Sequence, residues 1–459
     1  MTKIQSFIPM VLIVLLGTGC NNGDGHAPDK PFIPNKVFPG DDTSDFVENE
    51  TWSSTISLVW NGTDVTLCGE AEGVSVTASD GYVSVSSSAP HVTYAVSGNG
   101  AGQLSIYSRE RFQLSFEGLT LSCPNGPAVN IQSIRTCYAV LNGTNTLSDG
   151  ATYTPSPENR KAAFFSEGNL CFSGSGNLTI TGNHRHALAS DAYIRLCAGT
   201  GTVNLIAKIS DGMHTNDGVI INDGTVTINA VDEGIQCDQR SVLVTGGKII
   251  ITSQMEGMEA KGAIEISGGE IAIQAKDDAI NSGQDLTING GYIMAYSTDN
   301  DGIDANGNCY INGGVIYAIG THEPETAIDV NSEQRKQLYV QGGTLVAIGG
   351  LESGANLGQT CYSAASLSKD TWYALYSNDE AAFVFKTPSN LSSSKFIVST
   401  GGTTSLQSSV TTDGGTSILN GYALSGAAVS GGTAVALSAY TDSPQGDPGG
   451  PGGQGGPGH

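Results

Sequence analysis

The sequence predicts an all-β protein: a right-handed, single-stranded parallel β-helix with an N-terminal cap and a β-rich C-terminal extension. Three observations predict this fold. The 459 residues are 39% hydrophobic and include 62 Gly, so the chain can form a long core with many tight turns. A polar block around a Gly or Ala recurs at a nearly constant step, and a Gly-Gly block recurs in phase with it.

The first block is a polar segment followed by a Gly or Ala marker and then an apolar residue. Its markers are separated by 22, 23, 22, 23 and 25 residues. Three short strands and their turns fill about 22 residues, which matches one coil of a parallel β-helix. Leucine-rich repeats need a Leu and Asn spacing that is missing here, and calcium-binding nonapeptide repeats recur much faster. The copies are Ser210–Met213, Asp232–Ile235, Met255–Met258, Asp277–Ile280, Asn300–Ile303 and Glu325–Ile328.

The second block ends in Gly-Gly and is followed by alternating apolar residues, as is typical of a short strand. Weaker copies of the first block at Ala163–Phe165 and Ala187–Ala189 extend the repeat upstream. By period-two alternation, the apolar residue after each marker and the small residue two positions later should face the core, and the residue between them should point outward. The Gly-Gly pairs stand at residues 246–247, 268–269, 290–291, 313–314 and 342–343.

The repeat and the composition of the flanking segments divide the chain into six parts. A solenoid needs its open ends covered, so the irregular strands before the repeat are expected to form a cap. After residue 350 the repeat is lost, and strands rich in Thr, Ser and Gly follow. The expected parts are a lipoprotein signal peptide (1–20), a flexible tether (21–50), the N-terminal cap and early coils (51–150), the β-helix with coils of 22–25 residues (151–350), the C-terminal extension (351–442) and a disordered Gly/Pro-rich tail (443–459).

The N-terminus has the features of an export signal. An apolar run from Ile4 to Leu16 follows one positive charge and is too short to span a bilayer as a mature helix. It continues into Leu-Leu-Gly-Thr-Gly-Cys, which resembles a bacterial lipobox, so Cys20 is the expected lipidation site. We therefore expect an exported lipoprotein of the cell surface or outer membrane, attached to the membrane through its N-terminus. An ordinary secretory signal with an incidental cysteine is the alternative.

The charge balance limits the partners. Acidic residues outnumber basic ones by 44 to 20, which gives a formal net charge of −24. A protein this negative repels nucleic acid, which argues against nucleic acid as a partner. The cysteines after Cys20 form no CxxC pair, which argues against a zinc ribbon or a thioredoxin-like site. We expect a monomer.

Carboxylates recur directly before the marker, so stacked coils should bring them into one column. Neighbouring coils lie about 4.8 Å apart, where two like charges repel by roughly 1 kcal/mol in water and by more in a partly desolvated turn. Calcium, which takes about six to eight oxygen ligands, would offset this repulsion. The alternative is that the acidic residues cap turns and face solvent. The predicted calcium ligands are Asp211, Asp232, Glu233, Glu256, Asp277, Asp278, Asp301 and Asp304.

The repeats resemble those of a family of bacterial surface proteins described as carbohydrate-binding domain-containing proteins, right-handed β-helices similar to pectate lyases. The resemblance implies binding of plant cell-wall glycans, including acidic ones such as polygalacturonate, with calcium in the acidic sites. Bound Ca²⁺ inverts the local charge, so an acidic protein can hold uronate carboxylates. The sequence departs from the family where Ala279 and Ala327 replace Gly and where Thr326 interrupts the acidic column. The resemblance rests on the trailing Gly-Gly units and on the runs Glu256–Lys261, Asp277–Asn281 and Asp301–Ala305.

Outward-pointing side chains beside the acidic column, together with one tyrosine, are the candidates for carbohydrate binding. They are Glu259, Lys261, Asn281, Asp304 and Tyr292. Further tyrosines expected to be exposed, with rings that could stack on sugars, are Tyr296, Tyr310, Tyr317 and Tyr339. The run His184-Arg185-His186 is interpreted as a surface turn, because no further metal ligands are evident for it.

Lys261 is also the candidate catalytic residue of a pectate-lyase-like reaction. That reaction needs a base to remove the C5 proton of a uronate while Ca²⁺ neutralises the carboxylate. Glu256 and Glu259 are predicted to lie close to Lys261, where they would favour the protonated lysine and weaken it as a base. We expect a structural ion pair, and catalysis is the alternative.

Three classes of function fit the sequence. The first is calcium-dependent, non-catalytic binding of polysaccharide at the bacterial surface, with Ca²⁺ as the cofactor. The second is a calcium-dependent lyase that cleaves uronate-containing glycans by β-elimination. The third is an adhesin or structural surface protein. The acidic column and the family resemblance favour the first.

Overall fold

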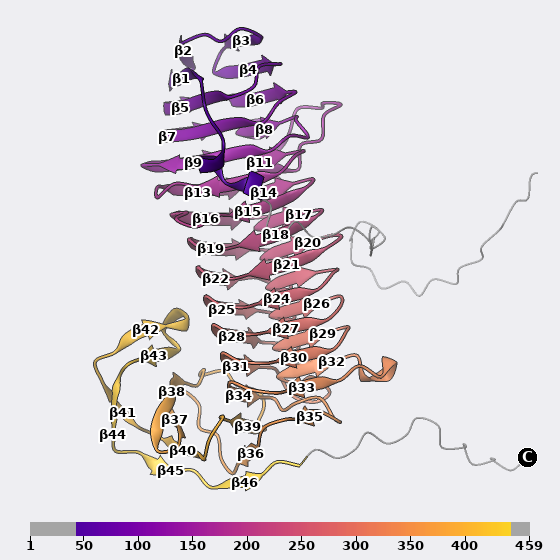
Figure 1. Cartoon of the computed structure of the whole chain (residues 1–459), viewed down its shortest axis with the longest axis vertical. Coiled ribbons are helices and arrows are strands. Elements are labelled where there is room, and N and C mark those ends of the chain that lie inside the picture. The colour runs from indigo at the N-terminus through magenta and orange to yellow at the C-terminus, as the bar shows by residue number, and fades with distance from the viewer. Residues whose placement is uncertain (1–42, 442–459) are drawn as a thin grey trace, which may run out of the picture. The chain divides into compact units, whose positions relative to one another are not determined.

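The computed structural model describes residues 43–441, and over this range the predicted parallel β-helix is confirmed (Figure 1). Each coil supplies one strand to each of three walls, which we number 1 to 3 in chain order within a coil. The sheet of wall 1 has twelve strands, of which only β3 pairs in the antiparallel sense, so the helix has about eleven coils. The predicted signal peptide with Cys20, residues 21–42 of the predicted tether and the predicted tail lie outside the described residues.

Wall 1 contains the strands that follow the acidic block. They are β4 (Tyr82–Ser87), β6 (Gln103–Ser108), β8 (Val129–Ile131), β11 (Ala162–Ser166), β14 (His186–Ser190), β17 (Met213–Thr215), β20 (Ile235–Cys237), β23 (Met258–Ala260), β26 (Ile280–Ser282), β29 (Ile303–Ala305) and β32 (Ile328–Val330).

Wall 2 precedes the Gly-Gly corner and wall 3 follows it. Wall 2 contains β9 (Cys137–Asn142), β12 (Leu170–Ser173), β15 (Tyr193–Leu196), β18 (Gly218–Ile221), β21 (Ser241–Val244), β24 (Ile264–Ile266), β27 (Leu286–Ile288), β30 (Cys309–Ile311), β33 (Leu338–Val340) and β35 (Asn356–Leu357). Wall 3 contains β10 (Thr144–Ser148), β13 (Asn177–Gly182), β16 (Thr202–Ala207), β19 (Thr225–Ala230), β22 (Lys248–Thr252), β25 (Glu270–Ala275), β28 (Tyr292–Ser297), β31 (Val315–Ile319) and β34 (Thr344–Ile348). The long strand β7 (Phe112–Ser122) pairs with both β9 and β10 and so joins these two walls.

The predicted core positions are confirmed. The apolar residue after each marker and the small residue two positions later are almost completely buried, with exposures of 0–1%. They form two ladders inside wall 1, because the parallel register places equivalent residues of successive coils side by side. These ladders are Met213, Ile235, Met258, Ile280, Ile303 and Ile328, and Thr215, Cys237, Ala260, Ser282, Ala305 and Val330.

Glycine has different roles at two corners of the coil. At the Gly-Gly corner the second residue has a positive φ between 81° and 96°, which glycine adopts without strain. At the acidic corner the marker glycine is required by space: a Cβ on Gly257 would lie 2.1 Å from Cγ2 of Ile273. In the next coil Ala279 is tolerated, because Ala295 stands where Ile273 stood. The alanine at marker position 279 therefore reflects a smaller neighbour on wall 3.

The N-terminal cap consists of β1 (Ser54–Gly62), β2 (Asp64–Cys68), β3 (Val74–Ser79) and β5 (Val92–Ala101), in which β1–β2 and β3–β4 are antiparallel pairs. Before it, the short 3₁₀ turns η1 (Thr43–Asp45) and η2 (Val47–Asn49) pack against wall 2. Asp45 is 1% exposed and pairs with Arg195 at 2.7 Å. Residues 43–50 of the predicted tether are thus part of the packed structure.

The C-terminal extension packs on the outer face of wall 3. Tyr296 and Tyr317, predicted to be exposed, are 2% and 0% exposed, because strands of the extension cover them. The Tyr296 hydroxyl donates to Asn390 at 2.7 Å, and the Tyr317 hydroxyl donates to the carbonyl of Lys386 at 3.1 Å. Its strands are β36 (Cys361–Ala364), β37 (Trp372–Ser377), β38 (Glu380–Lys386), β39 (Phe396–Ser399), β40 (Thr404–Ser408), β41 (Thr411–Asp413), β42 (Thr416–Ile418), β43 (Ala423–Ser425), β44 (Ala428–Ser430), β45 (Thr433–Ala434) and β46 (Leu437–Ala439).

Helical structure is confined to η1, η2, η3 (Ser332–Gln334) and η4 (Leu419–Gly421) within residues 43–441, and none of these turns is long or apolar enough to cross a membrane. The eight cysteines of the same range are free thiols, and all but Cys68 are buried.

Candidate functional site

The predicted column of carboxylates lies at the corner between walls 3 and 1. Backbone hydrogen bonds connect the coils here in a regular ladder: the amide after each acidic residue donates to the carbonyl of the acidic residue in the next coil, as from Gly257 to Asp278 at 2.9 Å. The regular step of the repeat therefore places these residues one above another. We call Asp211, Glu233, Glu256, Asp278 and Asp301 the acidic column.

The acidic column is more buried than turn-capping residues that face solvent would be. Asp211 is 1% exposed and Asp301 is 7% exposed, with Glu233 and Asp278 between them. Glu256 is half-buried, and its Oε2 atom has no hydrogen-bond partner within the described chain. Buried carboxylates without partners are costly, so a column of this kind needs protons or cations to compensate it.

Beside the acidic column, the outward residues of wall 1 form a second polar column. The register places His214, Gln236, Glu259, Asn281, Asp304 and Asp329 at equivalent positions of successive strands. Glu259 is only 5% exposed and has partners for both carboxylate oxygens: Nζ of Lys261 at 2.6 Å and Nε2 of Gln236 at 3.2 Å. The two polar columns are side by side and together form a strip of carboxylates and amides.

The C-terminal half of the acidic column contains only oxygen donors. Burial, reinforced by the negative charges of Asp304 and Asp301, raises the pKa of Asp278 to about 9. Burial likewise raises the pKa of Asp301 to about 7 and that of Asp304 to about 6. The Asp301 amide donates to Oδ1 of Asp278 at 3.0 Å, so one oxygen of Asp278 is oriented by the backbone. Without a cation, this part of the column retains protons near neutral pH, and a divalent cation could replace them.

A surface hollow lies at the turns that adjoin the acidic column. Asp277 accepts from Nδ2 of Asn300 at 2.6 Å. Both residues line a surface hollow of about 310 Å³, together with Lys276, Asp299 and Glu325. The predicted ligand Asp277 therefore lies between the buried column and open solvent.

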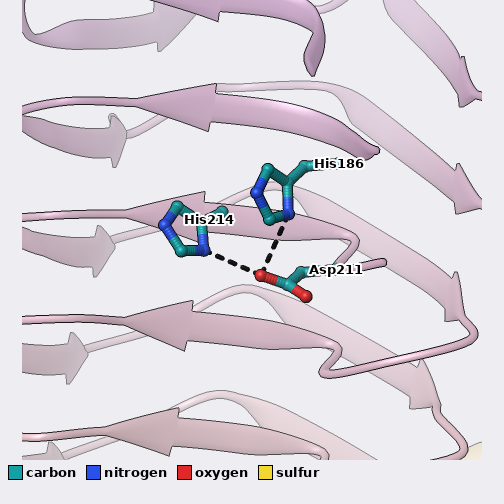
Figure 2. A group of neighbouring side chains, drawn as sticks. All are labelled: His186, Asp211 and His214. Carbon is teal, nitrogen blue, oxygen red and sulfur yellow. Dashed lines mark hydrogen bonds and ion pairs between the residues drawn. The ribbon is translucent and has the colours of Figure 1, made fainter. Parts of the chain in front are cut away.

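The N-terminal end of the column differs from the rest in its donor chemistry. Oδ2 of Asp211 lies 2.7 Å from Nδ1 of His214 and 3.0 Å from Nδ1 of His186 (Figure 2). Carboxylate oxygens of Asp232 and Glu233 are within 4.8 Å of Asp211 and of each other. The predicted ligands Asp211, Asp232 and Glu233 are thus brought together, and two histidines form a second group with Asp211.

The interpretation of His184–His186 as a surface turn is wrong for His186, which is 2% exposed and begins β14. The amide of Ala187 donates to the carbonyl of Asp211, so His186 occupies the acidic-column position one coil earlier. The signal was available in the sequence, since His186 directly precedes Ala187, a copy of the marker. His214, two residues after the marker Gly212, completes the group.

The structure brings together four of the five predicted carbohydrate-binding residues. Glu259, Asn281 and Asp304 lie in the second polar column, and Lys261 directly follows its strand. Tyr292 is 40% exposed but begins β28 at the Gly-Gly corner, at the opposite end of wall 3 from the acidic corner. Tyrosines on wall 2 form a separate aromatic surface: the rings of Tyr310 and Tyr339 stack with centroids 5.0 Å apart.

The environment of Lys261 matches the expected ion pair. Its amine is 2.6 Å from Oε1 of Glu259, whose side chain is 7% exposed, whereas the lysine side chain is 34% exposed.

A family model described as carbohydrate-binding domain-containing protein matches residues 79–324 and also residues 242–426. A solved structure, that of a polysaccharide lyase-like protein from C. thermocellum in a gadolinium derivative, is 20% identical, covers 60% of this chain and 96% of that chain, and has a TM-score of 0.41. A comparison with curated proteins found no match. Since the family model covers well over half of the sequence, the chain belongs to the family of carbohydrate-binding domain-containing proteins.

Proposed function

We propose that this protein binds an acidic polysaccharide of the plant cell-wall type through Ca²⁺ ions held by the C-terminal half of the acidic column. The observation that carries the proposal is the row formed by half-buried Glu256 and buried Asp278 and Asp301, with Asp304 beside it, in which every donor is oxygen. Hard cations such as Ca²⁺ prefer this donor set.

The geometry supports a bridging role for the cation. Ca²⁺ takes about six to eight oxygen ligands, and a column with one carboxylate per coil leaves coordination positions open on its solvent side. Uronate carboxylates of a glycan could fill those positions, since the bound ion inverts the local charge. Asn281 and the Lys261–Glu259 pair lie next to the same corner and offer hydrogen bonds to sugar hydroxyls. Regularly spaced coils suit an extended polymer.

We also propose that binding occurs at the bacterial surface, with the protein attached through Cys20 as a monomeric lipoprotein. The N-terminal apolar run and the lipobox-like sequence support this proposal. When expressed in a bacterial host, the wild-type chain should incorporate radiolabelled palmitate, and the variant Cys20→Ser should not.

Retention on polygalacturonate, with cellulose compared in parallel, tests the glycan proposal. The purified chain should be retained on polygalacturonate in the presence of Ca²⁺ and released by a chelator, with no rise in ultraviolet absorbance. A steady rise would instead identify a lyase, and its loss in Lys261→Met would identify Lys261 as the base. No retention on either glycan with Ca²⁺ present would overturn the proposal and favour an adhesin.

A further inference from the structure

His186, Asp211 and His214 converge on one buried point (Figure 2). Both Nδ1 atoms face the same carboxylate oxygen, Oδ2 of Asp211, at 3.0 Å and 2.7 Å. The imidazole rings stack at 18° with centroids 4.2 Å apart. Three ligand atoms from two successive coils therefore surround one small volume, since His186 begins β14 and His214 lies in β17.

An unsatisfied polar group is the second observation. His186 is 2% exposed, and neither of its ring nitrogens makes a hydrogen bond with any group in residues 43–441. Its contact with Asp211 has the distance of an ion pair but not the geometry of a hydrogen bond. Buried donors and acceptors are nearly always satisfied, so an orphan aimed at a carboxylate indicates a missing ion.

The donor set distinguishes this point from the rest of the acidic column. Two imidazole nitrogens and a carboxylate are ligands of Zn²⁺ and similar transition-metal ions, whereas Ca²⁺ prefers oxygen alone. Asp232 and Glu233 of the adjoining coil have carboxylate oxygens within 4.8 Å of Asp211, and a side-chain rotation would allow one of them to supply a fourth ligand. Nε2 of His214 lies 3.5 Å from Oδ2 of Asp238, the carboxylate–histidine arrangement that orients metal-binding imidazoles.

We propose that His186, Asp211 and His214, with Glu233 or Asp232 as a fourth ligand, form a structural Zn²⁺ site at the N-terminal end of the acidic column. Because the site is buried, the ion connects successive coils instead of meeting substrate. The proposal does not depend on glycan binding. The two imidazole donors distinguish this site from the oxygen-only positions of the acidic column.

Calorimetric titration with Zn²⁺ tests this site. The sample is the full-length chain, purified in mild detergent and treated with a chelator. Calcium is kept in large excess throughout to occupy oxygen-only sites. We expect one tight Zn²⁺ per chain, a rise in melting temperature on binding, and an affinity at least 100-fold weaker in His186→Ala. His322→Ala, which removes an exposed histidine, should bind Zn²⁺ like the wild type.

Cobalt provides a measurement that does not require a variant to fold. Co²⁺ added to the wild-type chain should give the intense visible absorption of a tetrahedral nitrogen- and oxygen-ligated site, and Zn²⁺ should abolish it. Asp211→Asn, a nearly isosteric change, should weaken that absorption. The proposal is overturned if Zn²⁺ binds the wild type and His186→Ala equally, if excess Ca²⁺ displaces Zn²⁺, or if Co²⁺ gives no tetrahedral spectrum.

Discussion

At the level of individual residues, the acidic column combines burial with raised pKa values. Asp278 and Asp301 are not surface turn caps but carboxyl groups with raised pKa values in a partly desolvated corner. The sequence predicted their column correctly, because a fixed coil length forces equivalent residues into register. It did not reveal their burial, which depends on how closely the turns of adjacent coils pack.

The raised pKa values predict an unusual pH dependence for the metal-free chain. A carboxyl group whose pKa is higher in the folded than in the unfolded state contributes stability below the unfolded value, and this is lost as pH rises through the folded value. For Asp278 the window runs from about 4 to about 9. Asp211, whose pKa two histidines hold well below its usual range against the effect of burial, loses its contribution only at lower pH.

The melting temperature of the chelator-treated chain should therefore decrease as the pH is raised from about 5 to about 9, a range taken from this window. Saturating Ca²⁺ should abolish the fall, and Asp278→Asn should reduce it, because the variant has no proton to lose. Differential scanning calorimetry across this range measures the effect. A metal-free melting temperature that rose steadily toward pH 9 would contradict the assigned burial of these acids.

At the scale of the coil, the sequence predicted the repeat, the core ladders and the Gly-Gly turns. These features follow from local alternation and a regular step. Two features were missed, one because its repeat signal is weak and the other because it depends on long-range contacts. His186 was not assigned to the acidic column, because the upstream copies of the first block are weak. Tyr296 and Tyr317 do point outward, as alternation requires, but a segment without the repeat docks over them.

The marker position allows a direct test of packing within a coil. Gly257→Ala should destabilise the protein by about 1–3 kcal/mol, because its new methyl group meets Ile273 and the carbonyl of Ala279 at 2.5 Å or less. The double variant Gly257→Ala/Ile273→Ala should lose less free energy of unfolding than the sum of the losses in the two single variants, since Ala279 and Ala295 already coexist in the next coil. Urea denaturation measures both, with Gly401→Ala, where nothing lies within 4 Å, as the neutral control. Strict additivity would refute the steric explanation.

On the scale of the whole molecule, the segments outside the repeat cover particular walls. Residues 43–50 pack on wall 2, and the C-terminal extension packs on wall 3. The acidic corner and the outward column of wall 1 between β20 and β32 carry polar side chains. A net charge of −24 on such a body makes cations necessary for approach of an acidic polymer.

The N-terminal segment should stabilise the whole helix through one buried ion pair. Asp45→Asn leaves Arg195, 3% exposed at its side chain, without its charged partner and should cost about 3 kcal/mol in the free energy of unfolding. Glu323→Gln, which removes the fully exposed partner of Lys395, should have no measurable effect. Chemical denaturation compares the two variants, and equal stabilities would show that the Asp45–Arg195 pair does not stabilise the fold.

Calcium binding itself is the most direct measurement of the central claim, that the oxygen-only part of the acidic column is a cation site. Isothermal titration of Ca²⁺ into the chelator-treated chain, with Zn²⁺ present at one equivalent, should show at least one site. Asp278→Asn combined with Asp301→Asn should weaken it at least 100-fold, whereas Asp379→Asn combined with Asp413→Asn, both exposed, should not. Equal calcium affinity in the two double variants, or no binding by the wild type, would contradict the account.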